Sequence, residues 1–106
     1  MKAFSFRLET LLHLREMAKD KAIAEYGLSL SRREDAEKAL EERKREMEDL
    51  REEIGRRRST GFSGAEQNTY NRSIERAKEK IIDSNSKVEE AKKIVEILIS
   101  YSQANQ

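Results

Sequence analysis

The chain of 106 residues has no cysteine, no proline and no tryptophan, and it contains only four glycines and one histidine. Without cysteine it forms no disulfide and offers neither a thiol nucleophile nor a thiolate metal ligand. With His13 as its single histidine, it has no histidine cluster for a metal ion. Because proline is missing, nothing forces a long helix to break. These absences favour long helices over a reactive site.

Long hydrophobic runs are missing as well. No stretch approaches the ~18 apolar residues of a membrane-spanning helix. The N-terminal segment lacks the apolar core of a secretory signal, because Arg7, Glu9 and Arg15 interrupt it. The 22 basic and 21 acidic residues are interspersed and give a net charge of +1. A balanced mixture of charges does not favour nucleic acid as a partner. Because neither a secretory signal nor a membrane-spanning run is visible, we expect a cytoplasmic protein.

The second half of the chain carries the clearest pattern, an apolar stripe in alternating steps of four and three residues. Its positions are Tyr70, Ile74, Ala77, Ile81, Ser84, Val88, Ala91, Val95 and Leu98. A 3.5-residue repeat sustained over about four heptads keeps one side of a helix against a partner helix. Ser63 and Glu66 have the spacing of a capping box, which predicts that this helix begins just after Ser63. The pattern predicts a helix over about 64–103.

A longer helix is predicted over about 5–57, followed by a tip loop over about 58–63 that contains Gly61. The apolar positions of this first helix are sparser than those of the second. They are Ile23, Tyr26 and Leu30, then Ala36, Leu40, Met47, Leu50 and Ile54, with a polar stretch over 31–35 between the two groups. We expect an all-α fold, an antiparallel two-helix coiled-coil hairpin with a longer first helix, as a single domain over 1–106. Folding about Thr60 makes the numbers of opposed residues sum to about 120. The alternative is one continuous helix paired with a second chain.

The unequal helix lengths leave residues before about Lys19 without an intramolecular partner. This segment holds the densest apolar group of the chain: Phe4, Phe6, Leu8, Leu11, Leu12, Leu14 and Met17. An uncovered apolar cluster indicates a binding surface, and we expect Arg15 to belong to it. Three alternatives remain: packing against Ile97, Ile99 and Tyr101, a homodimer, or a helix lying in a membrane interface.

No catalytic arrangement is visible, and we expect no enzyme activity, no cofactor, no metal and no small-molecule substrate. Carboxylates are abundant, but a solvated two-helix rod shapes no water-excluding cavity around them. The one basic block is Arg56, Arg57 and Arg58 beside the tip. Such a block often solvates a helix end and complements the helix dipole, and it could also contact nucleic acid or an acidic protein.

The N-terminal phrase from Phe4 to Glu16 is the most distinctive part of the sequence. It reads Phe-Ser-Phe-Arg-Leu-Glu-Thr-Leu-Leu-His-Leu-Arg-Glu. The aromatic-x-aromatic-basic-leucine start, the Leu-Leu pair and the following arginine resemble the opening of the flagellar export protein FliJ family. The remaining layout is similar too, with a charged first helix, a glycine-containing tip and a second helix that begins near Tyr70. The resemblance covers most of the chain.

The resemblance implies a non-enzymatic, cytoplasmic component of the bacterial flagellar type III export apparatus, peripherally associated with the inner membrane. It implies a coiled coil like the central stalk of rotary ATPases, and three partners: the export ATPase, the export gate membrane protein and export chaperones. The N-terminal cluster would engage the ATPase, and the tip with the shaft near Tyr70 would contact gate or chaperones. Two other functions remain open: a coiled-coil tether or adaptor without an export role, and a basic-tipped nucleic-acid binder.

Overall fold

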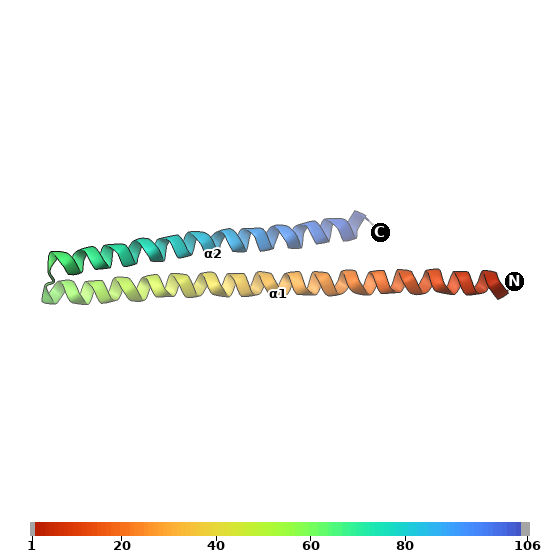
Figure 1. Cartoon of the computed structure of the whole chain (residues 1–106), viewed down its shortest axis with the longest axis horizontal. Helices are drawn as coiled ribbons and strands as arrows, with labels where there is room; N and C mark the ends of the chain where they lie inside the picture. Colours follow the sequence, from red (N-terminus) through yellow and green to blue (C-terminus); the bar gives the residue numbers. More distant parts are fainter. Residues whose placement is uncertain (1, 105–106) are drawn as a thin grey trace.

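The computed structural model describes residues 2–104 and shows two long α-helices that run antiparallel (Figure 1). The first helix, α1, spans Lys2–Thr60, and the second, α2, spans Gly64–Ala104. Together they form a rod with extents of 90 × 18 × 16 Å. The all-α hairpin with a longer first helix is therefore confirmed. Neither described helix is long and apolar enough at any point to cross a membrane.

α1 reaches beyond the expected 5–57 at both ends. At its C-terminal end, hydroxyl groups extend the last turn: Ser59 Oγ donates to the Arg56 carbonyl at 2.6 Å and Thr60 Oγ1 to the Arg57 carbonyl at 3.0 Å. Gly61 then adopts φ of +80°, and its N–H donates to the Arg58 carbonyl at 3.2 Å. A left-handed glycine at this position is a common helix C-cap, because it satisfies a terminal carbonyl without a Cβ clash. The helix ends at the glycine rather than at the arginines.

α2 begins with a capped first turn. Ser63 Oγ accepts a hydrogen bond from the Glu66 N–H at 3.3 Å, and the Ser63 carbonyl accepts one from the Gln67 N–H at 3.0 Å. Phe62 packs on Tyr70 with ring centroids 5.7 Å apart and planes inclined by 55°. This aromatic pair holds the loop against the first two turns of α2, as hydrophobic staples do at other helix starts.

The apolar stripe expected on α2 forms one side of the seam between the helices. All nine predicted positions are buried or half-buried, and Val88 and Val95 are only 3% exposed. On α1 the most buried residues are Ser29, Met47 and Ile54. The seam is one side chain deep and rich in small residues, so it buries little apolar area per residue.

The seam on α1 departs from the expected one in two respects. Half-buried Arg33 continues the heptad repeat through 31–35, the stretch that we expected to be polar, and half-buried Arg43 fills the heptad position between Leu40 and Met47. Arginine can do this because its aliphatic stem covers apolar surface while the guanidinium stays in water. Ser29 rather than Leu30 is the buried residue at its level, and Ile23, expected in the seam, is 60% exposed.

The register also differs from the expected one. Because α1 ends at Thr60 and α2 begins at Gly64, the loop is centred on Phe62, and the numbers of opposed residues sum to about 124 rather than 120. Met47 and Lys78 accordingly line the same shallow groove between the helices. The difference arises because the hydrogen bonds of Ser59 and Thr60 and the cap at Gly61 extend α1 past residue 57, where we expected it to end.

The N-terminal overhang and the basic tip as candidate binding surfaces

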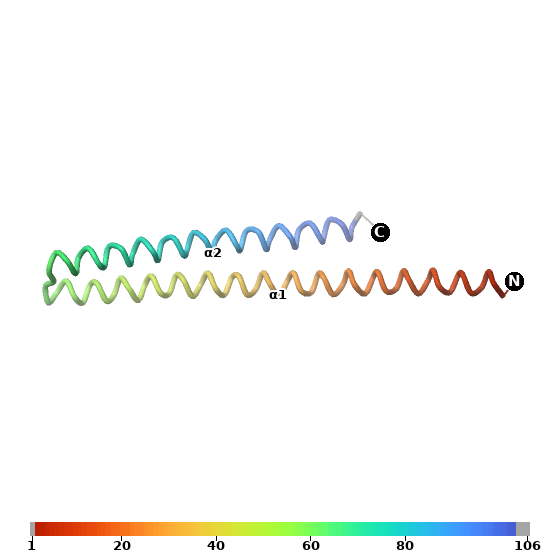
Figure 2. Tube along the Cα trace, viewed as in Figure 1, coloured from red at the N-terminus to blue at the C-terminus, as the bar shows by residue number. Residues whose placement is uncertain are grey.

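Residues 2–19 of α1 extend past the end of α2 as a single helix, which we call the N-terminal overhang (Figures 1 and 2). Every residue from 2 to 25 is exposed in the structure. The region from which sequence reasoning expected a partner-binding surface is therefore uncovered by the rest of the described chain.

Large apolar side chains make up much of the overhang surface. Phe4 and Phe6 are each 71% exposed, and Leu8, Leu11, Leu12, Leu14 and Met17 are about half exposed. The expected alternative, packing on the end of α2, is wrong, because Ile97, Ile99 and Tyr101 are exposed as well. Single exposed apolar residues are ordinary on protein surfaces, whereas large contiguous groups of them are typical of interaction surfaces.

The overhang side chains divide between two faces. Leu8, Leu12 and Arg15 lie on the heptad line that continues through Lys19 and Ala22 into the seam at Tyr26, since successive positions differ by three or four residues. Phe4 and Leu11 flank this line. Phe6 and Met17 lie on the opposite side of the helix, so the expected cluster is not one patch. We call the face of Phe4, Leu8, Leu11, Leu12 and Arg15 the overhang stripe.

The basic tip, Arg56, Arg57 and Arg58, lies at the other end of the rod (Figure 1). All three side chains are exposed, and no ion pair of the described residues involves them. Tyr70 is nearby, half-buried under Phe62, so it packs the tip and exposes only part of its ring. The structure thus separates the expected site residues into two surfaces at opposite ends of a 90 Å rod.

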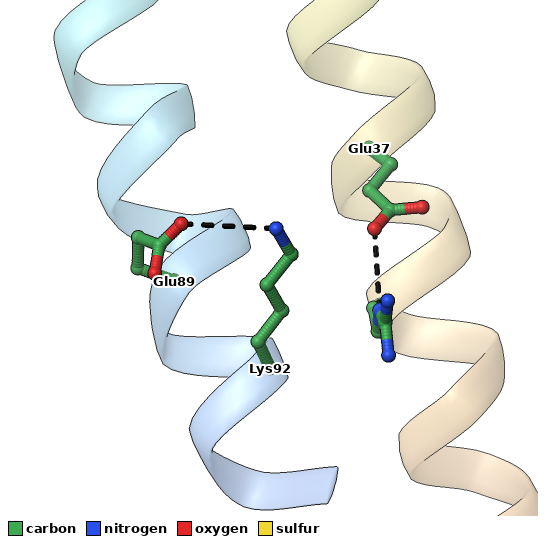
Figure 3. A network of polar contacts seen from close by, with 4 residues as sticks. Glu37, Glu89 and Lys92 are labelled. Carbon is green, nitrogen blue, oxygen red and sulfur yellow. Dashed lines mark hydrogen bonds and ion pairs between the residues drawn. The ribbon is translucent and has the colours of Figure 1, made fainter.

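The shaft between these ends carries its charges along each helix rather than across the seam. Every ion pair among residues 2–104 joins positions three or four apart in one helix. In Figure 3, Glu37 accepts from Arg33 on α1 at 3.2 Å, and Glu89 pairs with Lys92 on α2 at 3.8 Å. Exposed pairs of this kind contribute only a few tenths of a kcal/mol each. They solvate the shaft and form no interhelical network.

The described part of the chain offers no place for metal chemistry or an enclosed ligand. It contains no group of three or more His, Asp or Glu side chains that could hold a metal ion. The groove along the shaft, lined by Lys44, Met47, Glu48, Arg51, Lys78, Ile81 and Ile82, is shallow and open.

Comparison with protein-family models places the chain in a known family. The model described as flagellar FliJ protein matches residues 4–106, which is nearly the whole sequence. Comparisons with curated proteins and with solved structures find no match. The match begins at Phe4, the residue with which the distinctive N-terminal phrase also begins. The chain belongs to the flagellar FliJ protein family, a family of non-enzymatic flagellar export components.

Proposed function

We propose that this chain is a cytoplasmic stalk of the flagellar type III export apparatus that binds the export ATPase through the overhang stripe. The observation that carries the proposal is the exposed apolar stripe on a single helix that extends beyond the end of α2. A helix end of this kind fits into an apolar groove or ring opening, where aromatic and leucine side chains provide most of the binding free energy.

The charges around the stripe favour a protein partner over a lipid surface. Lys2, Arg7, Arg15 and Lys19 are accompanied by Glu9 and Glu16, so the acidic residues reduce the cationic character that an interfacial membrane helix requires. The basic tip has a different character, with three adjacent arginines and no apolar stripe. We assign the tip to the export gate or to export chaperones, where an acidic surface would complement it. Contact of the tip with the export gate, a membrane protein, would hold the rod at the inner membrane as a peripheral component.

The ATPase proposal is tested by charging the stripe. In Leu11→Glu/Leu12→Glu, two exposed apolar contacts become carboxylates that binding would bury. We expect affinity for the purified export ATPase to fall by more than about tenfold, because hot-spot side chains at protein interfaces each contribute ~2 kcal/mol or more. Fluorescence anisotropy measures the affinity, and ATP turnover reports any effect on the enzyme.

Met17→Glu is the matched control, because Met17 is similarly exposed but lies on the opposite face of the overhang. It should bind the ATPase like the wild type. Circular dichroism confirms that both variants remain helical hairpins. Wild-type affinity in the double variant would refute the ATPase site. A wild-type protein that neither binds the ATPase nor changes its turnover would favour a tether without an export role.

The tip assignment is tested separately with Arg56→Ala/Arg57→Ala/Arg58→Ala. Losing three positive charges should weaken binding to the cytoplasmic part of the gate or to an export chaperone and reduce its salt dependence. ATPase affinity should be unchanged, because the tip lies at the far end of the rod. If binding to labelled single-stranded DNA falls instead, and gate and chaperone binding do not, the nucleic-acid function is correct.

A further inference from the structure

The heptad line of the overhang stripe is symmetric about its own centre. Leu8 and Leu12 lie on either side of Thr10, and Ser5 and Arg15 are the next positions outward. A two-fold axis near Thr10 therefore superposes this line on itself in the antiparallel direction, as an isologous interface requires. We propose that the overhang pairs with the overhang of a second copy of this chain and forms an end-to-end dimer.

The contacts in this arrangement are apolar on apolar. Leu8 of each copy opposes Leu12 of the other, so four leucines fill the central layers. Phe4, Leu11 and Ala18 follow one another at intervals of seven residues on one flank. Across the two-fold axis, Leu11 lies beside the second copy's Leu11, and Phe4 lies beside the second copy's Ala18. Large residues thus meet small ones at the edges and leucines meet at the centre.

The charges on the opposite flank are compatible with this pairing. Lys2, Glu9 and Glu16 are also spaced by seven residues. Lys2 of each copy lies beside the second copy's Glu16, which gives two attractive pairs. Glu9 lies beside its counterpart near the axis, one unfavourable pair at the solvated edge. Each such pair contributes little, and the attractive pairs are the more numerous.

The second copy also fits the space that α2 leaves. Ala104, at the end of α2, lies opposite about Asp20, as the register of the hairpin requires. In the proposed dimer the second copy's Lys2 lies opposite about Ala18. The first helical turn of the second copy therefore lies near the end of α2, on the same side of α1 and with the same chain direction. The dimer seam is a continuation of the seam inside the hairpin.

The size of the interface predicts a weak dimer. Four large apolar side chains per copy, now about half exposed or more, and the stems around them bury on the order of 1,000 Å² in total, the lower limit for a specific interface. Interfaces near this lower limit are typical of weak, transient association, so we expect dissociation in roughly the micromolar range. If the overhang stripe also binds the ATPase, the two events compete. That consequence rests on the proposed function, whereas the dimer itself does not.

Small-angle X-ray scattering of the purified chain over a concentration series tests the dimer. Two hairpins of 90 Å that overlap only along the overhang have a maximum dimension of about 150 Å. We expect the maximum dimension to rise from near 90 Å towards this value as sedimentation velocity shows dimer forming. A monomer at every concentration would refute the proposal, and so would a dimer no longer than one hairpin.

Variants of the stripe and the opposite face test which residues form the interface. Leu8→Glu/Leu12→Glu should remain monomeric at the highest concentration with wild-type helicity, whereas Met17→Glu should dimerise like the wild type. The chain lacks cysteine, so a single introduced cysteine reports proximity without background. A short bismaleimide should crosslink Leu11→Cys into a dimer but leave Met17→Cys monomeric. Equal crosslinking at both positions, or dimerisation of the double variant, would refute the register.

No ATPase is present in these experiments, so their failure would leave the proposed function untouched. The reverse also holds, since a chain that dimerises as described but does not bind the ATPase would retain this interface and lose only the competition. Adding ATPase to dimeric protein then measures that competition directly: the dimer fraction should fall in proportion to the complex formed.

Discussion

At the scale of single residues, the hairpin depends on few fully buried side chains. Val88 and Val95 on α2, and Met47 and Ile54 on α1, are the only apolar residues of the described chain that are less than about a tenth exposed. The other seam positions are half-buried apolar residues such as Ile74 and Ile81, small residues, or arginines with the charged group in water. Each buried side chain therefore carries an unusually large share of the free energy of unfolding, because the seam has no second layer behind it.

Val88→Asp should destabilise the hairpin by about 3 kcal/mol or more, since it places a carboxylate without a partner at a position that is 3% exposed. Thermal unfolding followed by circular dichroism measures the change. Ile82→Asp is the matched control, because Ile82 is 68% exposed on the same helix and should change stability by less than ~0.5 kcal/mol. Similar losses in the two variants would contradict the assignment of the seam.

At the scale of the elements, each helix has a definite reason to end where it does. α1 ends because Gly61 takes a left-handed conformation and its N–H caps the last turn, and α2 starts because Ser63 accepts from the Glu66 N–H. Between Lys2 and Thr60 nothing interrupts α1, although Gly27 and Gly55 lie inside it with open space around them. The reversal is therefore local to three residues.

Alanine substitutions at two glycines should have opposite effects. Gly61→Ala forces a Cβ into a left-handed conformation and should cost about 1 kcal/mol. Gly27→Ala should add up to about 1 kcal/mol, because the position is helical and a Cβ there meets nothing within 4 Å. Chemical denaturation of both variants against the wild type checks the pair. A stabilised Gly61→Ala would mean that the reversal does not require the observed backbone.

Much of the element structure could be predicted from the sequence, and the exceptions have physical reasons. The stripe on α2 was predicted position by position because almost every member is apolar. The stripe on α1 was not predicted at every position, because Arg33 and Arg43 belong to it. Their aliphatic side-chain atoms pack in the seam, but an arginine in a sequence is interpreted as a polar residue. The predicted register was wrong: the numbers of opposed residues sum to about 124 and not to 120. The centre of the loop depends on hydrogen bonds of Ser59 and Thr60 and on the φ angle of Gly61, which the apolar pattern does not indicate.

The candidate site was predictable in part. The sequence located the exposed apolar segment, since a longer first helix requires it. It did not show that Phe6 and Met17 face away from Leu8 and Leu12, although helical periodicity carries that signal. Nor did it show that Tyr70 is partly covered by Phe62, because the contact depends on the path of the loop.

At the scale of the whole molecule, the overhang is structurally independent of the hairpin. None of residues 2–25 is buried, so the overhang adds surface without adding to the seam. The rod thus combines a self-sufficient shaft with one end that is available for partners.

Deletion of residues 2–16 should leave the thermal midpoint of the hairpin within a few degrees of the wild type at low protein concentration, since no buried contact is lost. Helicity per molecule should fall in proportion to the residues removed. Differential scanning calorimetry and circular dichroism check both expectations. A midpoint lowered by ten degrees or more would show that the overhang contributes to the folded core.

One unbroken helix carries both the overhang stripe and the basic tip, so the distance between these two surfaces is fixed by the length of that helix. Whatever binds at the two ends is held at a separation set by the number of residues between them, at 1.5 Å each. Adding seven residues to each helix would lengthen that separation by about 10 Å and nearly preserve the direction in which the stripe faces, whereas adding two or five would turn it to the opposite side. If the proposed partners bind at these two ends, the length of α1 sets both the distance between them and their relative orientation, independent of how tightly either is bound.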